Sequence, residues 1–185
     1  MLAYVFWHWK RSHITVAKYE IRQRAFHAAL AEAPPSGFDG SFSVAISHPP
    51  WEAGGDEVYE DWYLLKDFGS LGRLNEAAFS NDRAVLHDAA AAVAAGGAGG
   101  LYALRHGIAL RHPRYAHWIS KPNGMQSAEL IARLSPTVKL AQGALWMRQM
   151  ALGSAQQFCL HAAMHVSVPD EFSPLVVPLR PTWPL

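Results

Sequence analysis

Two short segments of the chain share one spacing of aromatic and basic residues, and this repeat constrains the fold more than any other feature. Residues 4–10 read Tyr-Val-Phe-Trp-His-Trp-Lys and residues 115–121 read Tyr-Ala-His-Trp-Ile-Ser-Lys, so both follow the pattern Tyr-x-x-Trp-x-x-Lys. Each segment opens a similar series, in which an extended stretch is followed by a helical stretch and two further extended stretches. The repeat predicts a duplicated α+β unit, in which a second copy covers sheet surface that one copy leaves bare.

The first predicted unit spans residues 1–108 and has the ferredoxin-like order β-α-β-β-α-β. Aromatic and β-branched residues favour strands, and Ser12 or Thr15 is suited to cap the first helix. The predicted helices cover 12–33, 71–78 and 83–95, and the predicted strands cover 3–10, 40–47, 59–68 and 101–106. The glycines at 96, 97, 99 and 100 are expected to end the third helix as a flexible connector.

The second predicted unit spans residues 109–185 and is degenerate, because it lacks a clear second helix; the alternative is that it only extends the first sheet. A hairpin turn is expected at Gly153-Ser154, and the end of the chain, 181–185, reads as a proline-rich tail. Ala, Gln, Leu and Met dominate residues 140–150, so a helix is the alternative to a strand there. The predicted helix covers 126–134, and the predicted strands cover 115–121, 144–152, 155–162 and 175–179.

Composition predicts a soluble, cytoplasmic protein with no membrane partner. Half of the residues are hydrophobic, and no apolar run near the start is long enough to cross a bilayer. Cys159 is the single cysteine, which excludes an intrachain disulfide and indicates a reducing compartment. Residues 25–65 carry acids but no Lys or Arg, whereas residues 105–148 carry seven basic residues against Glu129 alone. Two stretches of opposite charge either orient two parts of the chain or two subunits against each other, or they form two solvated surfaces.

The residue spacings do not support several other chemistries. Cys159, His161 and His165 have a spacing that suits a metal only if strand and helix geometry hold at once, so no metal site is predicted. The glycine-rich stretch precedes a strand and therefore does not cradle phosphate. No Gly-x-Ser-x-Gly elbow occurs. The third predicted strand carries acids and lacks the basic-glycine-aromatic signature of RNA-recognition modules, so nucleic acid is excluded as a partner.

The element order, the aromatic first strand Tyr4–Trp9 and the third-strand segment Tyr59-Glu60-Asp61-Trp62-Tyr63 resemble the dimeric α/β-barrel superfamily. That superfamily includes antibiotic-biosynthesis monooxygenases, EthD-like and NIPSNAP-like proteins, and chlorite dismutases. The resemblance is to the fold. It implies two ferredoxin-like sheets that form an α/β barrel, either within a duplicated chain or in a homodimer, and a ligand between a sheet and its helices.

The resemblance implies a small-molecule enzyme, with a cofactor-independent, monooxygenase-like reaction on an aromatic or polyketide-like substrate as the leading hypothesis. A non-catalytic small-molecule-binding or assembly protein is the alternative. A haem-dependent enzyme is the weaker alternative, because haem-binding relatives place an axial ligand on helices such as those expected to carry His27 and His87.

The candidate site is drawn from aromatic and basic residues of the first unit. His8 shares a strand face with Tyr4 and Phe6, and that face could line a pocket with Trp62 or Tyr63. Arg105 and His106 end the fourth predicted strand and point to opposite faces, so only one of them lines a given pocket. The predicted catalytic residues are His8, His106 and Arg105, with either histidine as general base and Arg105 stabilising an anion. The predicted substrate-binding residues are Tyr4, Phe6, Trp62, Tyr63 and Tyr102.

Overall fold

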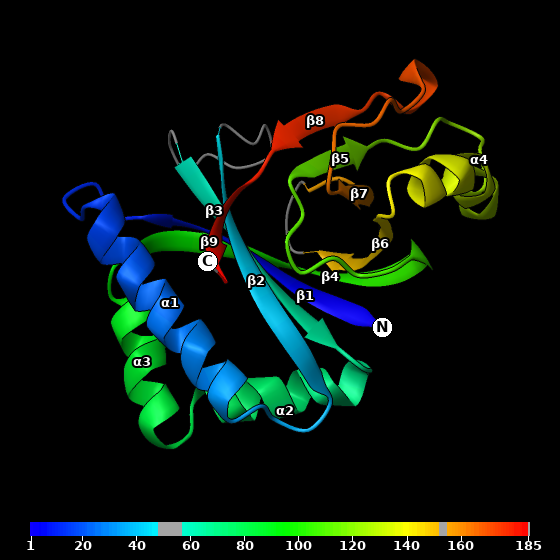
Figure 1. Cartoon of the computed structure of the whole chain (residues 1–185). Helices are drawn as coiled ribbons and strands as arrows, with labels where there is room; N and C mark the ends of the chain where they lie inside the picture. The colour runs from blue at the N-terminus through cyan, green and yellow to red at the C-terminus, as the bar shows by residue number, and fades with distance from the viewer. Residues whose placement is uncertain (48–56, 152–154, 185) are drawn as a thin grey trace.

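The computed structural model describes residues 1–47, 57–151 and 155–184. Within these residues, nine antiparallel strands form a single sheet that curls into a nearly closed barrel, with helices on its outside (Figure 1). The strand order is β8-β5-β7-β6-β4-β1-β3-β2-β9. In chain order the elements are β1 (Leu2–Lys10), α1 (Val16–Glu32), β2 (Phe38–Ser47), β3 (Glu57–Leu65), α2 (Phe68–Ala78), α3 (Asn81–Ala91), β4 (Ala94–Gly107), β5 (Tyr115–Ile119), α4 (Ser127–Leu140), β6 (Ala144–Ala151), β7 (Phe158–Ala162), a 3-10 turn η1 (Asp170–Phe172), β8 (Leu175–Pro178) and β9 (Arg180–Trp183).

The first half is a ferredoxin-like unit, as predicted. Its strands lie in the order β4-β1-β3-β2, and α1, α2 and α3 cover the outer face of the sheet (Figure 1). Thr15 caps α1, since its hydroxyl accepts a hydrogen bond from the Lys18 backbone N–H at 3.3 Å. Of the two proposed caps, the structure therefore selects Thr15.

The glycine-rich stretch is part of β4, and the prediction of a flexible connector was wrong. Gly96 and Gly97 pair with Trp9 and His8 of β1. A Cβ atom at Gly97 would lie 2.4 Å from Cζ of Phe6, and one at Gly96 would lie 2.6 Å from Cζ2 of Trp9. Glycine is needed here because aromatic rings of the neighbouring strand lie directly over the backbone.

The second half repeats the strand order of the first. The order β8-β5-β7-β6 matches β4-β1-β3-β2 when β5, β6, β7 and β8 take the places of β1, β2, β3 and β4. α4 covers its outer face, and η1 lies in the link where the first half has α2 and α3. The helix alternative for residues 140–150 was wrong, since β6 occupies most of that range. The predicted hairpin turn at Gly153-Ser154 lies outside the described residues.

α4 is longer than predicted because its apolar face continues past Leu134. Leu130, Leu134 and Val138 are spaced four residues apart, and all three are buried against the sheet. None of the described helices is long and apolar enough to cross a membrane.

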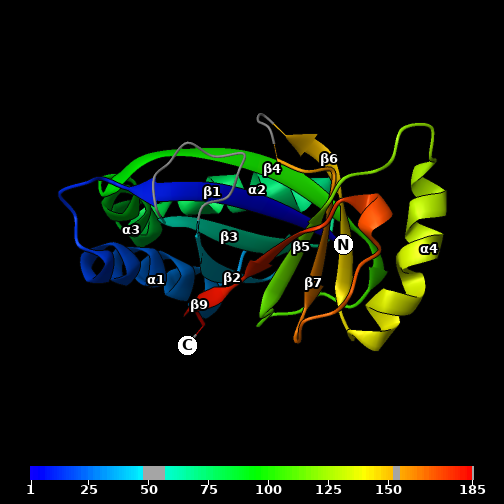
Figure 2. The ribbon, with the colours of Figure 1, turned by 90° about the horizontal axis from the view of Figure 1, so that it is seen from above.

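The C-terminal segment closes the barrel within one chain. β8 pairs with β5 at one edge of the sheet, and β9, two residues further on, pairs with β2 at the other edge (Figure 2). The predicted proline-rich tail was wrong in part, because its first residues form β9. Of the two alternatives for the barrel, the intrachain one is therefore observed.

Both halves contribute large side chains to the barrel core. Trp7 and Trp118, the tryptophans of the repeated motif, meet inside the barrel with ring centroids 6.0 Å apart. Trp62 lies beside Trp118 with ring centroids 6.4 Å apart, and the rings of Trp62 and Trp146 are 5.5 Å apart. The sequence repeat thus corresponds to equivalent strands whose inward faces share one core.

Candidate functional site

A cavity of about 870 Å³ lies between the outer face of the first-half sheet and helices α1, α2 and α3. Its walls are mainly apolar and aromatic, with Phe6 from β1, Phe26 from α1 and Leu74 from α2 among them. His8, Asp61 and Tyr63 provide a polar floor on the sheet side. A cavity of this size with few polar groups has the character of a small-molecule site.

Strand alternation brings the floor residues together. Tyr4, Phe6 and His8 lie on one face of β1, and Asp61 and Tyr63 lie on the same face of the adjacent β3. Tyr4 is directly opposite Tyr63, and their rings stack with centroids 5.9 Å apart. The prediction that His8 shares a face with Tyr4 and Phe6 is consistent with this arrangement.

Asp61 is the centre of the polar floor. Its Oδ2 lies 3.1 Å from Nε2 of His8 and 3.2 Å from Nε2 of His27. Tyr63 also donates its hydroxyl to Oδ2, at 3.1 Å. Burial alone would raise the pKa of Asp61, but the two imidazoles hold that pKa well below its ordinary value. Oδ1 is buried and has no hydrogen-bond partner among the described residues.

Each imidazole is supported on its other side by a hydroxyl. Nδ1 of His8 lies 2.6 Å from the Tyr19 hydroxyl, and Nδ1 of His27 lies 2.8 Å from the Ser41 hydroxyl. Burial, with Asp61 nearby, raises the pKa of Tyr19 and keeps its hydroxyl protonated. The two hydroxyls hold the planes of the His8 and His27 rings, so that Nε2 of each ring faces Asp61.

Asp61 and His27 are the residues of this network that the sequence did not identify as partners. His27 comes from α1, is fully buried and stacks on Tyr63 at 5.2 Å. The signal available in the sequence was Asp61 itself, an acid in the middle of an aromatic strand. A carboxylate in such a strand requires a hydrogen-bonded or charged partner, although the sequence does not say which.

Glu60, the neighbour of Asp61, points to the opposite face of β3 and into the barrel. Its two carboxylate oxygens accept hydrogen bonds from the indole N–H groups of Trp7 at 3.0 Å and Trp62 at 3.2 Å. Burial raises the pKa of Glu60 to about 7, although the two indole donors counteract part of the rise. Trp62 and Tyr102, both predicted to bind substrate, lie in this barrel core and are absent from the cavity lining.

The remaining predicted catalytic residues lie away from the cavity lining. Nη2 of Arg105 donates to the Gln149 side chain at 3.3 Å, and Nε2 of His106 lies 2.8 Å from the Ser135 hydroxyl on α4. Both contacts are with the second half. The structure thus places Tyr4, Phe6, His8 and Tyr63 around one cavity and places Arg105 and His106 elsewhere.

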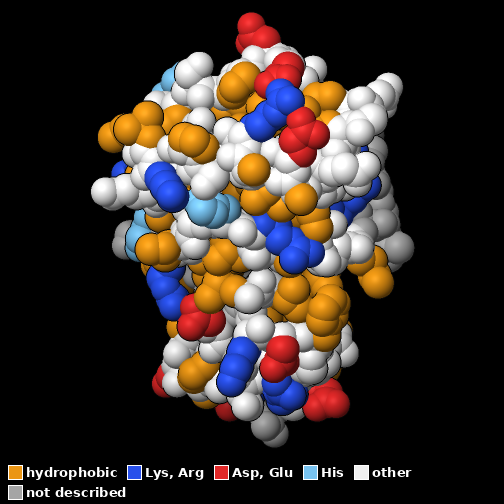
Figure 3. Space-filling view, turned by 90° about the vertical axis from the view of Figure 1, so that its right-hand side faces the viewer, with side chains coloured by type: hydrophobic (Ala, Val, Ile, Leu, Met, Phe, Trp, Pro, Cys, Tyr) orange, Lys and Arg blue, Asp and Glu red, His pale blue; other side chains and the backbone are white. Residues whose placement is uncertain are grey.

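Charge on the second half is dispersed. Figure 3 views the side that lies at the right of Figure 1, and its Lys and Arg side chains stand singly or in small groups among apolar and acidic ones. Arg133, for example, contacts Glu129 at 2.7 Å and Glu171 at 3.0 Å. This favours the interpretation of the basic stretch as a partly neutralised, solvated surface.

The described residues do not fit a metal or a haem well. No group of three or more His, Cys, Asp or Glu among them could hold a metal ion. Both ring nitrogens of His27 are engaged, at Ser41 and at Asp61, so it has none for an axial bond. His87 lines the cavity and packs edge-on against Phe79, but no described lining residue is a Lys or Arg that could pair with haem propionates.

Comparison with known proteins identifies the fold. No protein-family profile matches the sequence, and no curated protein sequence matches it significantly. A candidate monooxygenase from Fusobacterium nucleatum subsp. nucleatum has a similar structure, with a TM-score of 0.64 and 11% identity over 98% of this chain and 92% of that one. An anthrone oxidase-like protein gives 0.54 and 8% over 97% and 90%, and a candidate monooxygenase from Lactobacillus acidophilus NCFM gives 0.53 and 10% over 98% and 94%.

These likenesses confirm the ferredoxin-like α/β-barrel fold that the resemblance implied. Because the shared identity is so low, the fold alone is established and any activity must be argued from the site.

Proposed function

We propose that the chain is a small-molecule enzyme of the monooxygenase or oxidase kind, acting on an aromatic or polyketide-like substrate in the cavity between the first-half sheet and its helices. The observation that carries the proposal is the buried Asp61 carboxylate, whose Oδ1 has no partner among the described residues at the floor of a largely apolar cavity. The structural neighbours, among them an anthrone oxidase-like protein, support a reaction of this kind.

In the proposed reaction, the ligand donates a hydroxyl or enol hydrogen bond to Oδ1 of Asp61 and passes its proton to that oxygen. His8 and His27 hold the carboxylate ionised and in place, and Tyr63 donates to Oδ2. The substrate anion then adds to dioxygen and supplies two electrons, so that a C–O bond forms and the proton returned by Asp61 completes a hydroperoxide. Loss of the remaining proton from that carbon supplies two further electrons and breaks the O–O bond. One oxygen atom stays as the carbonyl of the product, and the other leaves with that proton as water.

The test is a panel of neutral hydroxyaromatic compounds, including anthrone, offered to the protein in air. Oxygen uptake and product mass would be followed together. We expect Asp61→Asn to lower turnover by roughly 10²- to 10⁴-fold, because the amide cannot accept the proton. We expect His106→Gln and Arg105→Gln to change turnover less than about twofold, since both lie off the cavity; the opposite pattern would favour the sequence-based assignment of those residues.

A non-catalytic binding protein is the second candidate. Burial alone would raise the pKa of Asp61, but the two adjacent imidazoles outweigh it and lower that pKa. The carboxylate therefore stays ionised and able to accept a hydrogen bond, but it is a weak base. If native mass spectrometry detects a retained hydroxyaromatic ligand and no compound of the panel is consumed, the binding function is favoured over catalysis.

A homodimer stays a prediction of the resemblance. Because the barrel closes within one chain, a second subunit is not needed to complete it. The same native mass spectrum would show whether the protein is monomeric or dimeric.

A further inference from the structure

The last strand, β9, contacts the surroundings of both imidazoles that flank Asp61. The Trp183 ring stacks on His27 with centroids 6.2 Å apart and an interplanar angle of 18°. Thr182 donates its hydroxyl to Ser43 of β2 at 2.8 Å. β9 therefore covers the His27 side of the network, and its first residue, Arg180, reaches toward the His8 side.

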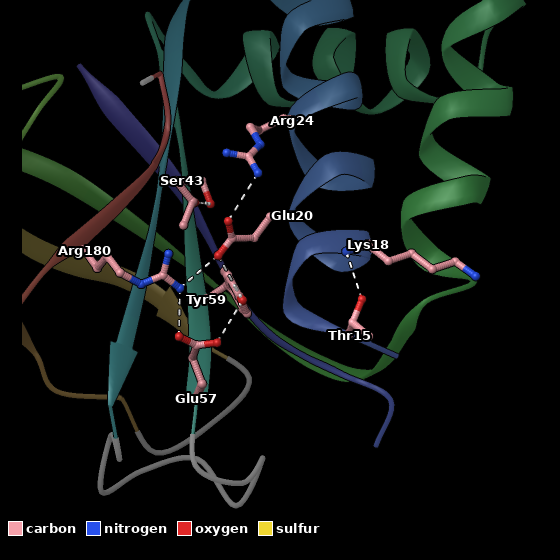
Figure 4. Close-up of polar contacts among 9 residues, drawn as sticks. Thr15, Lys18, Glu20, Arg24, Ser43, Glu57, Tyr59 and Arg180 are labelled. Atoms are coloured by element: carbon pink, nitrogen blue, oxygen red, sulfur yellow. Dashed lines mark hydrogen bonds and ion pairs between the residues drawn. The ribbon is translucent and has the colours of Figure 1, made fainter. Parts of the chain in front are cut away.

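Arg180 joins two glutamates from different elements. Its Nη2 lies 2.9 Å from Oε1 of Glu20 on α1 and 2.7 Å from Oε1 of Glu57 on β3. Figure 4 shows the guanidinium between the two carboxylates, with Tyr59 below Glu20. Tyr59 donates its hydroxyl to Oε2 of Glu57 at 2.9 Å and lies 3.4 Å from Glu20. The cluster of Arg180, Glu20, Glu57 and Tyr59 thus ties the C-terminal strand to α1 and β3.

Tyr59 connects this cluster to His8. It pairs with His8 across β1 and β3, and the two rings stack at 5.6 Å with an interplanar angle of 14°. Tyr59 also packs on Tyr19, the hydroxyl partner of His8, at 5.0 Å. A shift of the Tyr59 ring would therefore change both the ring that stacks on His8 and the position of the hydroxyl that contacts Nδ1 of His8.

Without Arg180, two carboxylates would converge on the Tyr59 hydroxyl. Arg24 contacts Glu20 at 3.3 Å, but through its other oxygen, Oε2. Glu20 is 8% exposed, so water can relieve the repulsion only in part. The carboxylates would separate and carry the Tyr59 side chain with them.

We propose that Arg180 is a positioning residue, which sets the ring plane of His8 through Glu20, Glu57 and Tyr59 and thereby makes the C-terminal strand part of the site. The kinetic consequence rests on the proposed function, whereas the structural consequence for His8 does not. The ion pairs themselves contribute little to stability, because the Arg180 side chain is 50% exposed.

The chain offers a matched control in Arg133. This residue also bridges two glutamates, Glu129 and Glu171, and its side chain is 47% exposed. It lies in the second half, and it is not a cavity-lining residue. Arg133→Met therefore removes the same kind of ion pair without touching the neighbourhood of His8.

The test compares long-range ¹H–¹⁵N spectra of the histidine rings in Arg180→Met, Arg180→Lys and Arg133→Met. We expect Arg180→Met to shift the His8 ring signals and Arg133→Met to leave them in place. Arg180→Lys should leave them close to their parent positions, because both contacts of Arg180 go through a single nitrogen. If a substrate is in hand, Arg180→Met should lower kcat by roughly ten- to a hundredfold with a smaller change in KM.

Tyr59→Phe provides a second, independent variant, because it keeps the ring and removes its hydroxyl link to the carboxylates. The double variant with Arg180→Met should shift His8 no further than the larger single change, since both act through one route. Unchanged His8 signals in Arg180→Met, an equal shift in Arg133→Met, or strictly additive shifts in the double variant would overturn the proposal. A shifted His8 in a protein that converts no compound would uphold the positioning role and count against the enzyme function alone.

Discussion

The two halves of the barrel share one strand order, but the outer faces of their sheets differ in polarity. Trp7 is paired with Glu60 in the first half as Trp118 is paired with Cys159 in the second, so the positions on each side can be matched. By this register, the first-half residues His8, Asp61 and Tyr63 correspond to Ile119, Leu160 and Ala162. The polar floor of the cavity is thus replaced, position by position, by hydrocarbon.

The covering helices differ in the same sense. α4 packs Leu130, Leu134 and Val138 directly onto Leu160 and its neighbours. In the first half, α1, α2 and α3 leave a cavity of about 870 Å³ over Asp61. The inner faces of both halves share one packed core. In a duplicated fold of this type, the outer layer of one half can therefore be packed for stability while the outer layer of the other half keeps a cavity for a ligand.

The largest loss of stability should follow from placing a carboxylate at the second-half position that corresponds to Asp61. Leu160→Asp places a carboxylate in the hydrocarbon core under α4, opposite the single buried imidazole of His117, whose pKa burial lowers to about 4. Asp61 has two imidazoles and the Tyr63 hydroxyl as partners, so we expect Leu160→Asp to cost about 4 kcal/mol or more of unfolding free energy. Urea denaturation measures this. Leu160→Met is the control, with an expected cost below about 1.5 kcal/mol. A Leu160→Asp protein as stable as the parent would mean that the outer face of the second half is not a closed core.

The reverse change in the first half should cost less. Asp61→Leu removes the carboxylate that contacts Nε2 of His8 and of His27 and accepts a hydrogen bond from Tyr63, at an expected cost of about 1–3 kcal/mol. The cavity gives the new side chain room. Denaturation of both variants under one condition checks the order. A larger loss from Asp61→Leu than from Leu160→Asp would contradict the assignment of the first-half floor as the functional one.

The pH dependence of stability gives another test of the comparison, through the buried His161 of the second half. His161 points into the barrel without a described hydrogen-bond partner, and burial lowers its pKa to about 3. Between its ordinary pKa of about 6.5 and this value, the unfolded chain binds more protons than the folded one, so stability falls as the pH falls. Between pH 6.5 and pH 5, the unfolding free energy of His161→Leu should fall by about 2 kcal/mol less than that of the parent.

Denaturation of the parent and His161→Leu across this range provides the measurement. Glu60→Gln serves as a control of opposite sign. Because burial raises the pKa of Glu60 to about 7, the folded state binds more protons than the unfolded one below that pH, and Glu60 weakens the fold as the pH rises toward 7. If His161→Leu loses stability in acid as steeply as the parent, the acid response arises elsewhere.

The smallest expected effect concerns the cavity rim. Phe79 lines the cavity, packs edge-on against His87 at 4.5 Å and is 58% exposed. Phe79→Ala should weaken ligand binding a few-fold and lower stability by less than about 1 kcal/mol. Titration with a hydroxyaromatic ligand checks the first expectation. Leu140→Ala, at an exposed apolar position of α4, is the matched control and should leave binding unchanged.

The fold could be predicted largely because its signals are local. Alternation placed Phe42, Val44 and Ile46 on one face of β2, and apolar spacing located α1 and α4. The glycines of β4 were misjudged because their role depends on rings of another strand, which no local pattern reveals. The last strand, β9, was missed altogether for the same reason, since it forms only by pairing with β2.

For the site, the sequence alone determined which residues share a strand face, because the two-residue period of a strand is a local property: Tyr4, Phe6 and His8 follow from it. Which of the two sheet faces keeps a cavity depends on how the helices pack on the sheet, and for this reason Tyr63 lines the cavity while Trp62 lies in the barrel core. Only the tertiary structure brought His27 from α1 and Trp183 from the C-terminus to Asp61 and its partners. Contacts between elements far apart in the chain depend on packing and charge in three dimensions, and these are not encoded in any single window of sequence.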